Sequence, residues 1–332
     1  MKTKLSIVAG FLLGTILLFF AFKNVPFANV VAIYKKVNPR FIVPFVITAL
    51  CELALRGARW RLLLSPARPV RLWDTFRLEA AGLALSNILP LRLGEVIRGT
   101  FGSRILGIPM VTVFATILVE RALDVLTLLA IFSVAACFGG VSGALVNYDK
   151  WMIVMCAGLF AGLGALIFSD ELVAHRWFSG FFARFAPARS IFERLAMGVR
   201  GFHSFKSASL IIGFAFLQWS LSALNVYWVS CSFGLESVLG FSRSVALVVA
   251  GAAAASVPGM PGYFGNFEFV ISKVTASWGI AMDVGFALAL YMHVLGYIFI
   301  TLLGVIFIYQ MGHSLGRIWG DFSGRPGADL NA

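Results

Sequence analysis

The stretch NILPLRLGE at residues 87–95 interrupts an apolar region that covers about residues 76–104. Proline lacks a backbone donor and its ring clashes with the preceding helical turn, so a helix through this stretch is expected to break. A second apolar region, about residues 244–281, is interrupted in the same way by VPGMPGYFGNFE at residues 257–268. Each region is therefore predicted to form two half-helices. Whether each pair crosses a membrane or enters and returns stays open.

The rest of the chain is far more apolar than a water-soluble protein. Hydrophobic residues make up 60% of the 332 residues and charged residues 13%, and the mean hydropathy is +0.90. The apolar residues come in runs of about twenty, the length that crosses a bilayer as a helix. Six such runs are predicted as full spans, at about residues 5–22, 41–64, 111–138, 151–169, 208–234 and 284–311.

The fold class that follows is all-α, a polytopic transmembrane helical bundle of about six full spans and two broken helix pairs. We treat residues 1–332 as a single membrane domain. The basic segment 170–207 is assigned to the cytoplasm, because basic residues concentrate in cytoplasmic loops. Both termini are then cytoplasmic, and the two broken pairs enter from opposite faces as inverted copies. Within residues 171–207, aromatic residues alternate with arginines, which indicates an amphipathic segment at the membrane interface or an anchoring loop.

The stretch VERALD at residues 119–124 carries three charges inside a predicted span. An ionised side chain at the centre of a span costs roughly 2.5 to 3.5 kcal/mol on insertion scales, so these charges need partners. Glu120 and Asp124 lie one turn apart on a helix, and Arg121 is close enough to Asp124 to pair with it. The group either holds a broken helix in place or takes part directly in substrate passage.

Polar and helix-breaking residues cluster at the first interruption: Asn87, Pro90, Arg92, Gly94, Glu95 and Arg98. A half-helix that begins near Gly94 would present free backbone N–H groups and a partial positive charge. Arg92 and Arg98 would add full positive charge, which suits a phosphate. They are also candidate partners of the acidic residues at 119–124. The alternative is that both arginines extend to the cytoplasmic interface.

At the second interruption, Pro261, Gly262 and Gly265 permit a tight turn, and Glu268 follows at membrane depth. Glu268 could pair with an arginine, take up a proton or cap a half-helix, and the sequence does not choose among these. His293 lies in the last predicted span, where a histidine more often packs through a hydrogen bond than binds a ligand.

Three stretches, at residues 89–98, 119–124 and 261–268, stand in the order typical of one family. They read Leu-Pro-x-Arg-x-Gly-Glu-x-x-Arg, Val-Glu-Arg-x-x-Asp and Pro-Gly-x-x-Gly-x-x-Glu. In this the chain resembles the transmembrane, flippase-like domain of the lysylphosphatidylglycerol synthase family. The resemblance implies that a lipid head group moves across the membrane. Members often carry a Tyr-Arg pair in the last span, where this chain has Tyr291-Met-His293, so substrate choice stays open.

The leading hypothesis is a lipid flippase or lipid-related transporter in the cytoplasmic (inner) membrane of a prokaryote. Its expected partners are membrane lipids, anionic or phosphate-bearing, and no nucleic acid is expected, since the net charge of +12 resides between the apolar runs. The alternatives are a lipid-modifying transferase embedded in the membrane and a scaffolding subunit of a lipid-synthesis complex. No metal or nucleophile motif is present, so an enzyme, a metal site and a cofactor are not expected. Whether copies of the chain form a homo-oligomer is left open.

Overall fold

The computed structural model describes residues 27–89, 93–137, 158, 199–257 and 261–312. The predicted spans at 5–22 and 151–169, and all but residues 199–207 of the segment 171–207, lie outside these residues.

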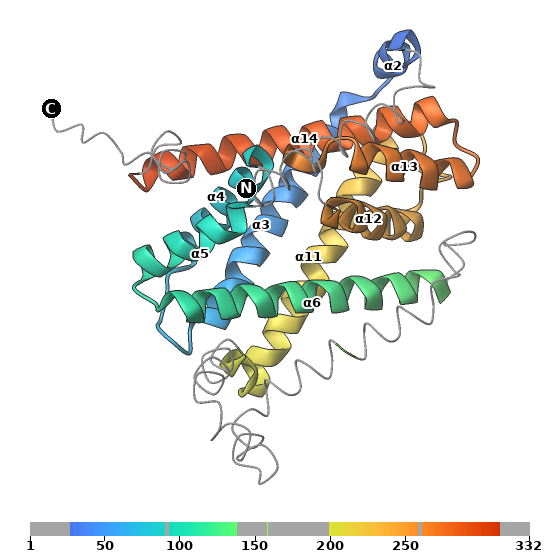
Figure 1. The fold of residues 1–332 in the computed structure, drawn as a ribbon. Coiled ribbons are helices and arrows are strands. Elements are labelled where there is room, and N and C mark those ends of the chain that lie inside the picture. The colour runs from blue at the N-terminus through green and yellow to red at the C-terminus, as the bar shows by residue number, and fades with distance from the viewer. Residues whose placement is uncertain (1–26, 90–92, 138–157, 159–198, 258–260, 313–332) are drawn as a thin grey trace, which may run out of the picture.

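Within the described residues the chain is helical, as the apolar runs predict (Figure 1). The helices of the first half are α2 (Phe27–Tyr34), α3 (Ile42–Leu64), α4 (Leu72–Ile88), α5 (Leu93–Leu106) and α6 (Met110–Cys137). Those of the second half are α11 (Phe205–Ser232), α12 (Phe241–Ser256), α13 (Asn266–Ser277) and α14 (Met282–Gln310). Short 3-10 turns complete the list: η1 (Pro39–Phe41), η4 (Arg200–Phe202) and η5 (Pro261–Tyr263).

Among the described residues, three helical segments are long and apolar enough to cross a membrane: Pro39–Leu64, Phe205–Ser232 and Met282–Gln310. They coincide with three of the predicted spans. Helix α6 is 28 residues long, so it has the length of a fourth. Helix α6 carries Glu120, Arg121 and Asp124, and α3 carries Glu52, Arg56 and Arg59. The chain is therefore a helical membrane protein in which two of the long helices carry several charged residues each.

Both interrupted regions are broken into helix pairs, which confirms that prediction. Helix α4 ends at Ile88 and α5 begins at Leu93, while α12 ends at Ser256 and α13 begins at Asn266. In the second break, Gly262 has φ of 68° and Gly265 has φ of 91°. These values lie in the left-handed region that glycine adopts without a steric penalty. The glycines therefore let the chain turn between the two short helices.

The two halves repeat one order of helices, and the second half is inverted. Each half contains a long helix, two short helices and a long helix: α3 to α6, then α11 to α14. The first members, α3 and α11, pack against each other and run antiparallel. Phe41, at the start of α3, stacks on Trp228 near the end of α11, and Leu63, near the end of α3, packs with Ile211 near the start of α11. Equivalent helices that run antiparallel define an inverted repeat.

The last helix of each half packs on the first short helix of the other half. Helix α14 lies against α4, and α6 lies against α12. In Figure 1, α6 and α14 extend along opposite sides of the molecule and α3 and α11 cross the space between them. The short pairs α4–α5 and α12–α13 lie at opposite ends of that view. Each broken pair is thus enclosed by helices from both halves, which suits irregular backbone at membrane depth.

The α4–α14 contact depends on small residues. A Cβ on Gly304 would overlap the carbonyl oxygen of Ala80 and the Cβ of Ala84. Close approach through glycine and alanine is the usual way in which membrane helices gain packing energy, since lipid supplies no hydrophobic drive between helices. Gly304 therefore sets the distance between the two halves at this point.

We expect Gly304→Ala to lower the free energy of unfolding by about 1 to 3 kcal/mol, the typical cost of overpacking. Gly296→Ala, on the same helix, is the matched control, because a Cβ there meets nothing within 4 Å. Reversible unfolding in mixed detergent micelles measures both. Equal stability of the two variants would contradict the assignment of Gly304 to a tight contact.

Candidate functional site: a buried ion network beside a polar cavity

Glu120 is the centre of a buried ion network in the first half. Its side chain is fully buried on α6, and four guanidinium groups surround its carboxylate. Arg98 of α5 donates to Oε2 from Nη2 at 3.1 Å, and Arg121 approaches Oε1 at 3.1 Å. Arg59 and Arg56, both from α3, approach Oε1 at 3.5 and 3.6 Å. One carboxylate therefore ties α3, α5 and α6 together.

Glu79 brings α4 into the same network. Its carboxylate is fully buried and forms an ion pair with Arg98. Arg56 lies on its other oxygen, with Nε 3.8 Å from Oε2. The guanidinium of Arg98 also lies over the ring of Trp60, 4.6 Å from the ring centroid. Arg98 of α5 thus contacts α4, the other helix of the broken pair, and the neighbouring helices α3 and α6.

Asp124 lies one turn after Glu120 and forms the cavity side of the network. Its Oδ1 is 2.8 Å from Nη1 of Arg59 and accepts a hydrogen bond from Nε1 of Trp219 at 3.1 Å. Its Oδ2 is 3.1 Å from Nη1 of Arg121, the pair that the sequence spacing predicts. Nε of Arg121 in turn lies 3.3 Å from Oε1 of Glu95. Arg121 therefore forms ion pairs with three carboxylates.

Charge is balanced across the network as the structure describes it. Its arginines and carboxylates are Arg56, Arg59, Arg98 and Arg121, with Glu79, Glu95, Glu120 and Asp124. A buried charge without a partner costs several kcal/mol, so mutual pairing is what makes these groups tolerable at membrane depth. The arginine side chains of the network also differ in how far they are exposed. Arg121 has 32% of its side chain exposed, whereas Arg59 has none.

Sequence reasoning missed three members of the network. These are Arg56 and Arg59 of α3 and Glu79 of α4. Arg56 contacts Glu79 and Glu120, and Arg59 is completely buried. The spacing of Arg56 and Arg59, three residues apart inside a span, was the available signal, because it puts both on one helix face. For Glu79 the only signal in the sequence was an acidic residue inside an apolar region.

The second half contains a smaller polar pair, Glu268 of α13 and His293 of α14. Oε2 of Glu268 accepts a hydrogen bond of 2.7 Å from the backbone N–H of Gly265, so the side chain caps its own helix. Its Oε1 lies 2.6 Å from Nδ1 of His293. Both side chains are buried. Of the roles that the sequence left open for Glu268, the structure thus contains the cap, and its side-chain partner is a histidine rather than an arginine.

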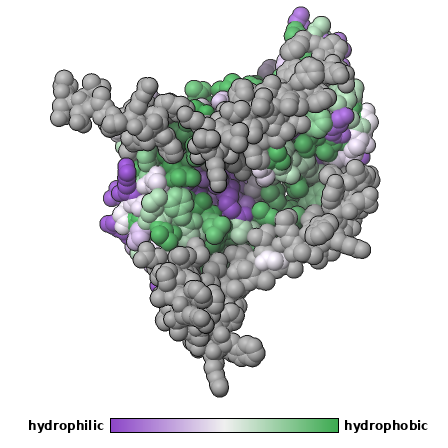
Figure 2. Space-filling model, in the orientation of Figure 1, coloured by the Kyte–Doolittle hydropathy of each residue, from purple (hydrophilic) through white to green (hydrophobic). Residues whose placement is uncertain are grey.

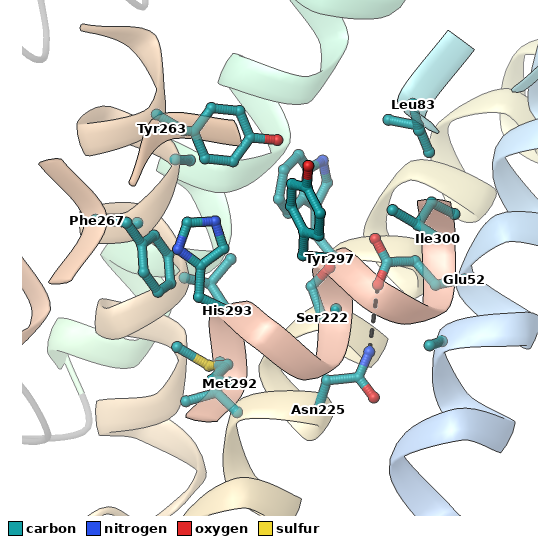
Figure 3. Close-up of a pocket in the computed structure, with 18 of the residues that line it drawn as sticks. Glu52, Leu83, Ser222, Asn225, Tyr263, Phe267, Met292, His293, Tyr297 and Ile300 are labelled. Atoms are coloured by element: carbon teal, nitrogen blue, oxygen red, sulfur yellow. Dashed lines mark hydrogen bonds between the residues drawn. The ribbon is translucent and has the colours of Figure 1, made fainter. Parts of the chain in front are cut away.

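Aromatic rings surround His293. Its imidazole stacks on Phe264 with centroids 4.2 Å apart and on Tyr263 at 5.7 Å, and Phe267 lies at 4.9 Å. These three rings come from the turn and the first residues of α13, so the second break forms the wall against which the histidine rests. Figure 3 shows the imidazole beside Phe267, with Tyr263 and Tyr297 bordering the space in front of it.

A cavity of about 480 Å³ connects the two polar groups. Charged and polar residues of both halves line it: Glu52, Arg56, Asn87, Arg121, Asp124 and His293. Glu52 accepts a hydrogen bond of 3.4 Å from Asn225 at the wall of the cavity opposite His293 (Figure 3). On the face drawn in Figure 2, hydrophilic residues lie between hydrophobic areas. The charged residues are therefore gathered at a cavity whose other lining side chains are mostly apolar.

The other predicted residues have distinct environments. Asn87 donates to Oγ1 of Thr301 at 3.1 Å. Pro90 and Arg92 lie outside the described residues. A Cβ on Gly94 would overlap the carbonyl oxygen of Gly82, so this glycine is required by the packing of α5 on α4. Pro261, Gly262 and Gly265 form the turn that precedes α13.

The fold and site together define a helical membrane protein with two inverted halves, two broken helix pairs and charges buried around one cavity. A family model described as the lysylphosphatidylglycerol synthase TM region matches residues 7–304. The chain therefore belongs to the lysylphosphatidylglycerol synthase transmembrane family, as the three motifs suggested. No curated protein and no solved structure matches it. Among the described residues, no group of three or more histidine, cysteine or acidic side chains could hold a metal ion.

We expect Glu120→Gln to lower the free energy of unfolding by about 3 to 5 kcal/mol, because it leaves four guanidinium groups short of a buried counter-charge. Asp74→Asn is the matched control, since Asp74 forms a partly exposed pair with Arg77 at 2.6 Å. Removing such a pair costs about 1 kcal/mol or less. Unfolding in mixed micelles measures both variants. A Glu120→Gln protein as stable as Asp74→Asn would contradict the central role of this carboxylate.

Proposed function

We propose that this protein moves a phosphate-bearing lipid head group across the membrane. The observation that carries the proposal is a cavity lined by charged residues of the first half and by His293 of the second. A head group is polar and its acyl chains are apolar. Charged side chains in a cavity among apolar helices would let the head group cross while the chains stay in lipid. Membership of a family of lipid-synthase membrane domains supports the same substrate class.

Arg121 is the residue that we propose as the ligand of the phosphate. It lines the cavity and is the most exposed arginine of the network, at 32% against 8% or less for Arg56, Arg59 and Arg98. A guanidinium binds phosphate through two parallel hydrogen bonds. Because Arg121 already shares its donors among several carboxylates, a phosphate could replace one of these partners without exposing a bare charge.

The inverted repeat supplies a route for movement between the two faces. In transporters with inverted repeats, substrate binds near the middle of the membrane beside broken helices, and one half tilts against the other. The contacts α4–α14 and α6–α12 are the two surfaces on which such a tilt would occur here. The broken pairs α4–α5 and α12–α13 would then alternate in closing the cavity.

The proposal includes the cytoplasmic membrane of a prokaryote as the location, with both termini in the cytoplasm. The basic segment 170–207 supports that orientation. The partners are the membrane's own anionic or phosphate-bearing lipids, and the transport step itself calls for no chemical cofactor, because no covalent bond is made or broken.

We expect Arg121→Gln to slow lipid movement in proteoliposomes by about tenfold or more, since a hydrogen bond to a charged group contributes about 1.5 to 3 kcal/mol. The rate is followed with fluorescent phospholipids of several head groups and a membrane-impermeant quencher. Arg104→Gln is the matched control, because Arg104 is exposed at the end of α5 and lies outside the network. The control should move lipid at the wild-type rate.

Two results would contradict the proposal. The first is wild-type protein that does not accelerate the movement of any head group above that of empty vesicles. The second is Arg121→Gln that moves lipid as fast as Arg104→Gln, which would show that the cavity arginine is not a ligand. Mass spectrometry of the vesicle lipids in the same assay separates transport from a lipid-modifying reaction, which would change the mass of the probe.

A further inference from the structure

The hydrogen bonding around Glu268 fixes which nitrogen of His293 carries its proton. An ionised Glu268 only accepts hydrogen bonds, so with Glu268 ionised the Nδ1 atom that lies 2.6 Å from Oε1 is the donor. The second carboxylate oxygen is occupied by the N–H of Gly265. The neutral imidazole is therefore held as its Nδ1–H tautomer, and the lone pair of Nε2 is available on the opposite side of the ring.

Nε2 of His293 is buried and has no hydrogen-bond partner in the part of the chain that the structure describes. The residue is only 8% exposed, and it lines the cavity. A buried acceptor without a partner costs roughly 1 to 3 kcal/mol, so such atoms are rare unless they bind something. Here a carboxylate orients the ring on one side and the cavity offers access on the other.

We propose that His293 and Glu268 form a proton-binding site that couples lipid movement to a proton; this rests on the proposed transport function. The lone pair of Nε2 accepts a proton from water in the cavity and a new N–H bond forms. Nδ1 keeps its own proton, and the carboxylate of Glu268 compensates the charge of the imidazolium. Release reverses the step, the proton returns to water, and no oxidant or other reactant is consumed.

Proton uptake at His293 changes the charge of the cavity lining and so affects the binding of phosphate. Across the cavity lie Glu52 and Arg56 of α3 and Arg121 and Asp124 of α6, two of each sign. The imidazolium adds one positive charge to this lining, which favours an anionic head group. By linkage, a bound phosphate favours proton uptake to the same degree.

The remaining titratable groups around the pair are tyrosines. Tyr263 and Tyr297 border the cavity beside the ring. Tyr34 of α2 donates to the carbonyl of Ala287, and Tyr291 lies next to it on α14. A phenol carries no charge in its protonated form, so these side chains add no charged group to the surroundings of the pair.

The inverted repeat supports the assignment independently. In each half a polar pair ties the second short helix to the following long helix: Arg98 to Glu120 between α5 and α6, and Glu268 to His293 between α13 and α14. Arg121 and Glu95 form a second ion pair between α5 and α6. Arginine keeps its proton at any physiological pH, so the pairs of the first half are permanent. The pair of the second half contains the one kind of side chain whose ordinary titration falls between pH 5 and 8. One half is therefore fixed and the other can change its charge.

The first test reads the proton directly in the full-length protein. Histidine labelled with ¹⁵N is followed by NMR in lipid nanodiscs, and the ring signals of His293 are assigned by their loss in His293→Gln. We expect the Nδ1–H tautomer at high pH and protonation of Nε2 on acidification. The Nε2–H tautomer at high pH, or ring signals that stay constant on acidification, would overturn the proposal.

The second test reads coupling. Proteoliposomes carry a fluorescent phosphatidylglycerol probe, and a pH gradient is imposed while potassium and valinomycin hold the membrane potential at zero. We expect the gradient to change the wild-type rate several-fold. In Glu268→Gln, which keeps an acceptor for the N–H of Gly265, and in His293→Gln, the ratio of rates with and without the gradient should fall to one. His203→Gln, an exposed histidine outside the cavity, should respond like wild type.

Failure of this proposal and failure of the transport proposal give different results. If labelled lipid moves at a rate that ignores the gradient in the wild type, the proton site is wrong and transport stands. If no lipid moves under any condition, transport is wrong, and the NMR titration by itself decides whether the pair binds a proton.

Discussion

The pairing of buried arginines with buried carboxylates is the constraint on which the rest of this structure depends. Four helices would each carry an intolerable charge into an apolar environment if they stood alone. Around Glu120 and Glu79 these charges become mutual partners, which forces α3, α4, α5 and α6 into one arrangement. The broken helix pair is thereby anchored, since Arg98 of α5 reaches carboxylates on both α4 and α6. Stability and the position of the cavity have the same cause.

The inverted repeat turns this local network into an asymmetric cavity. Both halves use the same order of helices, yet the first contributes a dense set of permanent charges and the second a single Glu268–His293 pair among aromatic rings. The cavity lies between them. One wall therefore carries paired arginines and carboxylates, and the other carries the Glu268–His293 pair. In the proposed mechanism the first wall binds the head group and the second binds the proton.

The small residues and the charges act at different places for different reasons. Gly94 and Gly304 lie where backbones approach closely, and a Cβ at either would overlap a neighbouring helix. Gly262 and Gly265 instead supply backbone angles that allow the second turn. Gly94, Gly262 and Gly265 are not among the residues that line the cavity. Arg121 and Asp124 reach it with side chains.

The sequence by itself determined the membrane class, the helix breaks and the family, because each depends on local properties: apolar length, proline and short motifs. It also determined the Arg121–Asp124 pair, since helical spacing sets that contact. Only the tertiary structure decided that Arg59 and Glu79 belong to the network and that Glu268 meets His293. Those contacts join helices far apart in the chain, and their geometry follows from how the inverted halves pack, which no local pattern encodes.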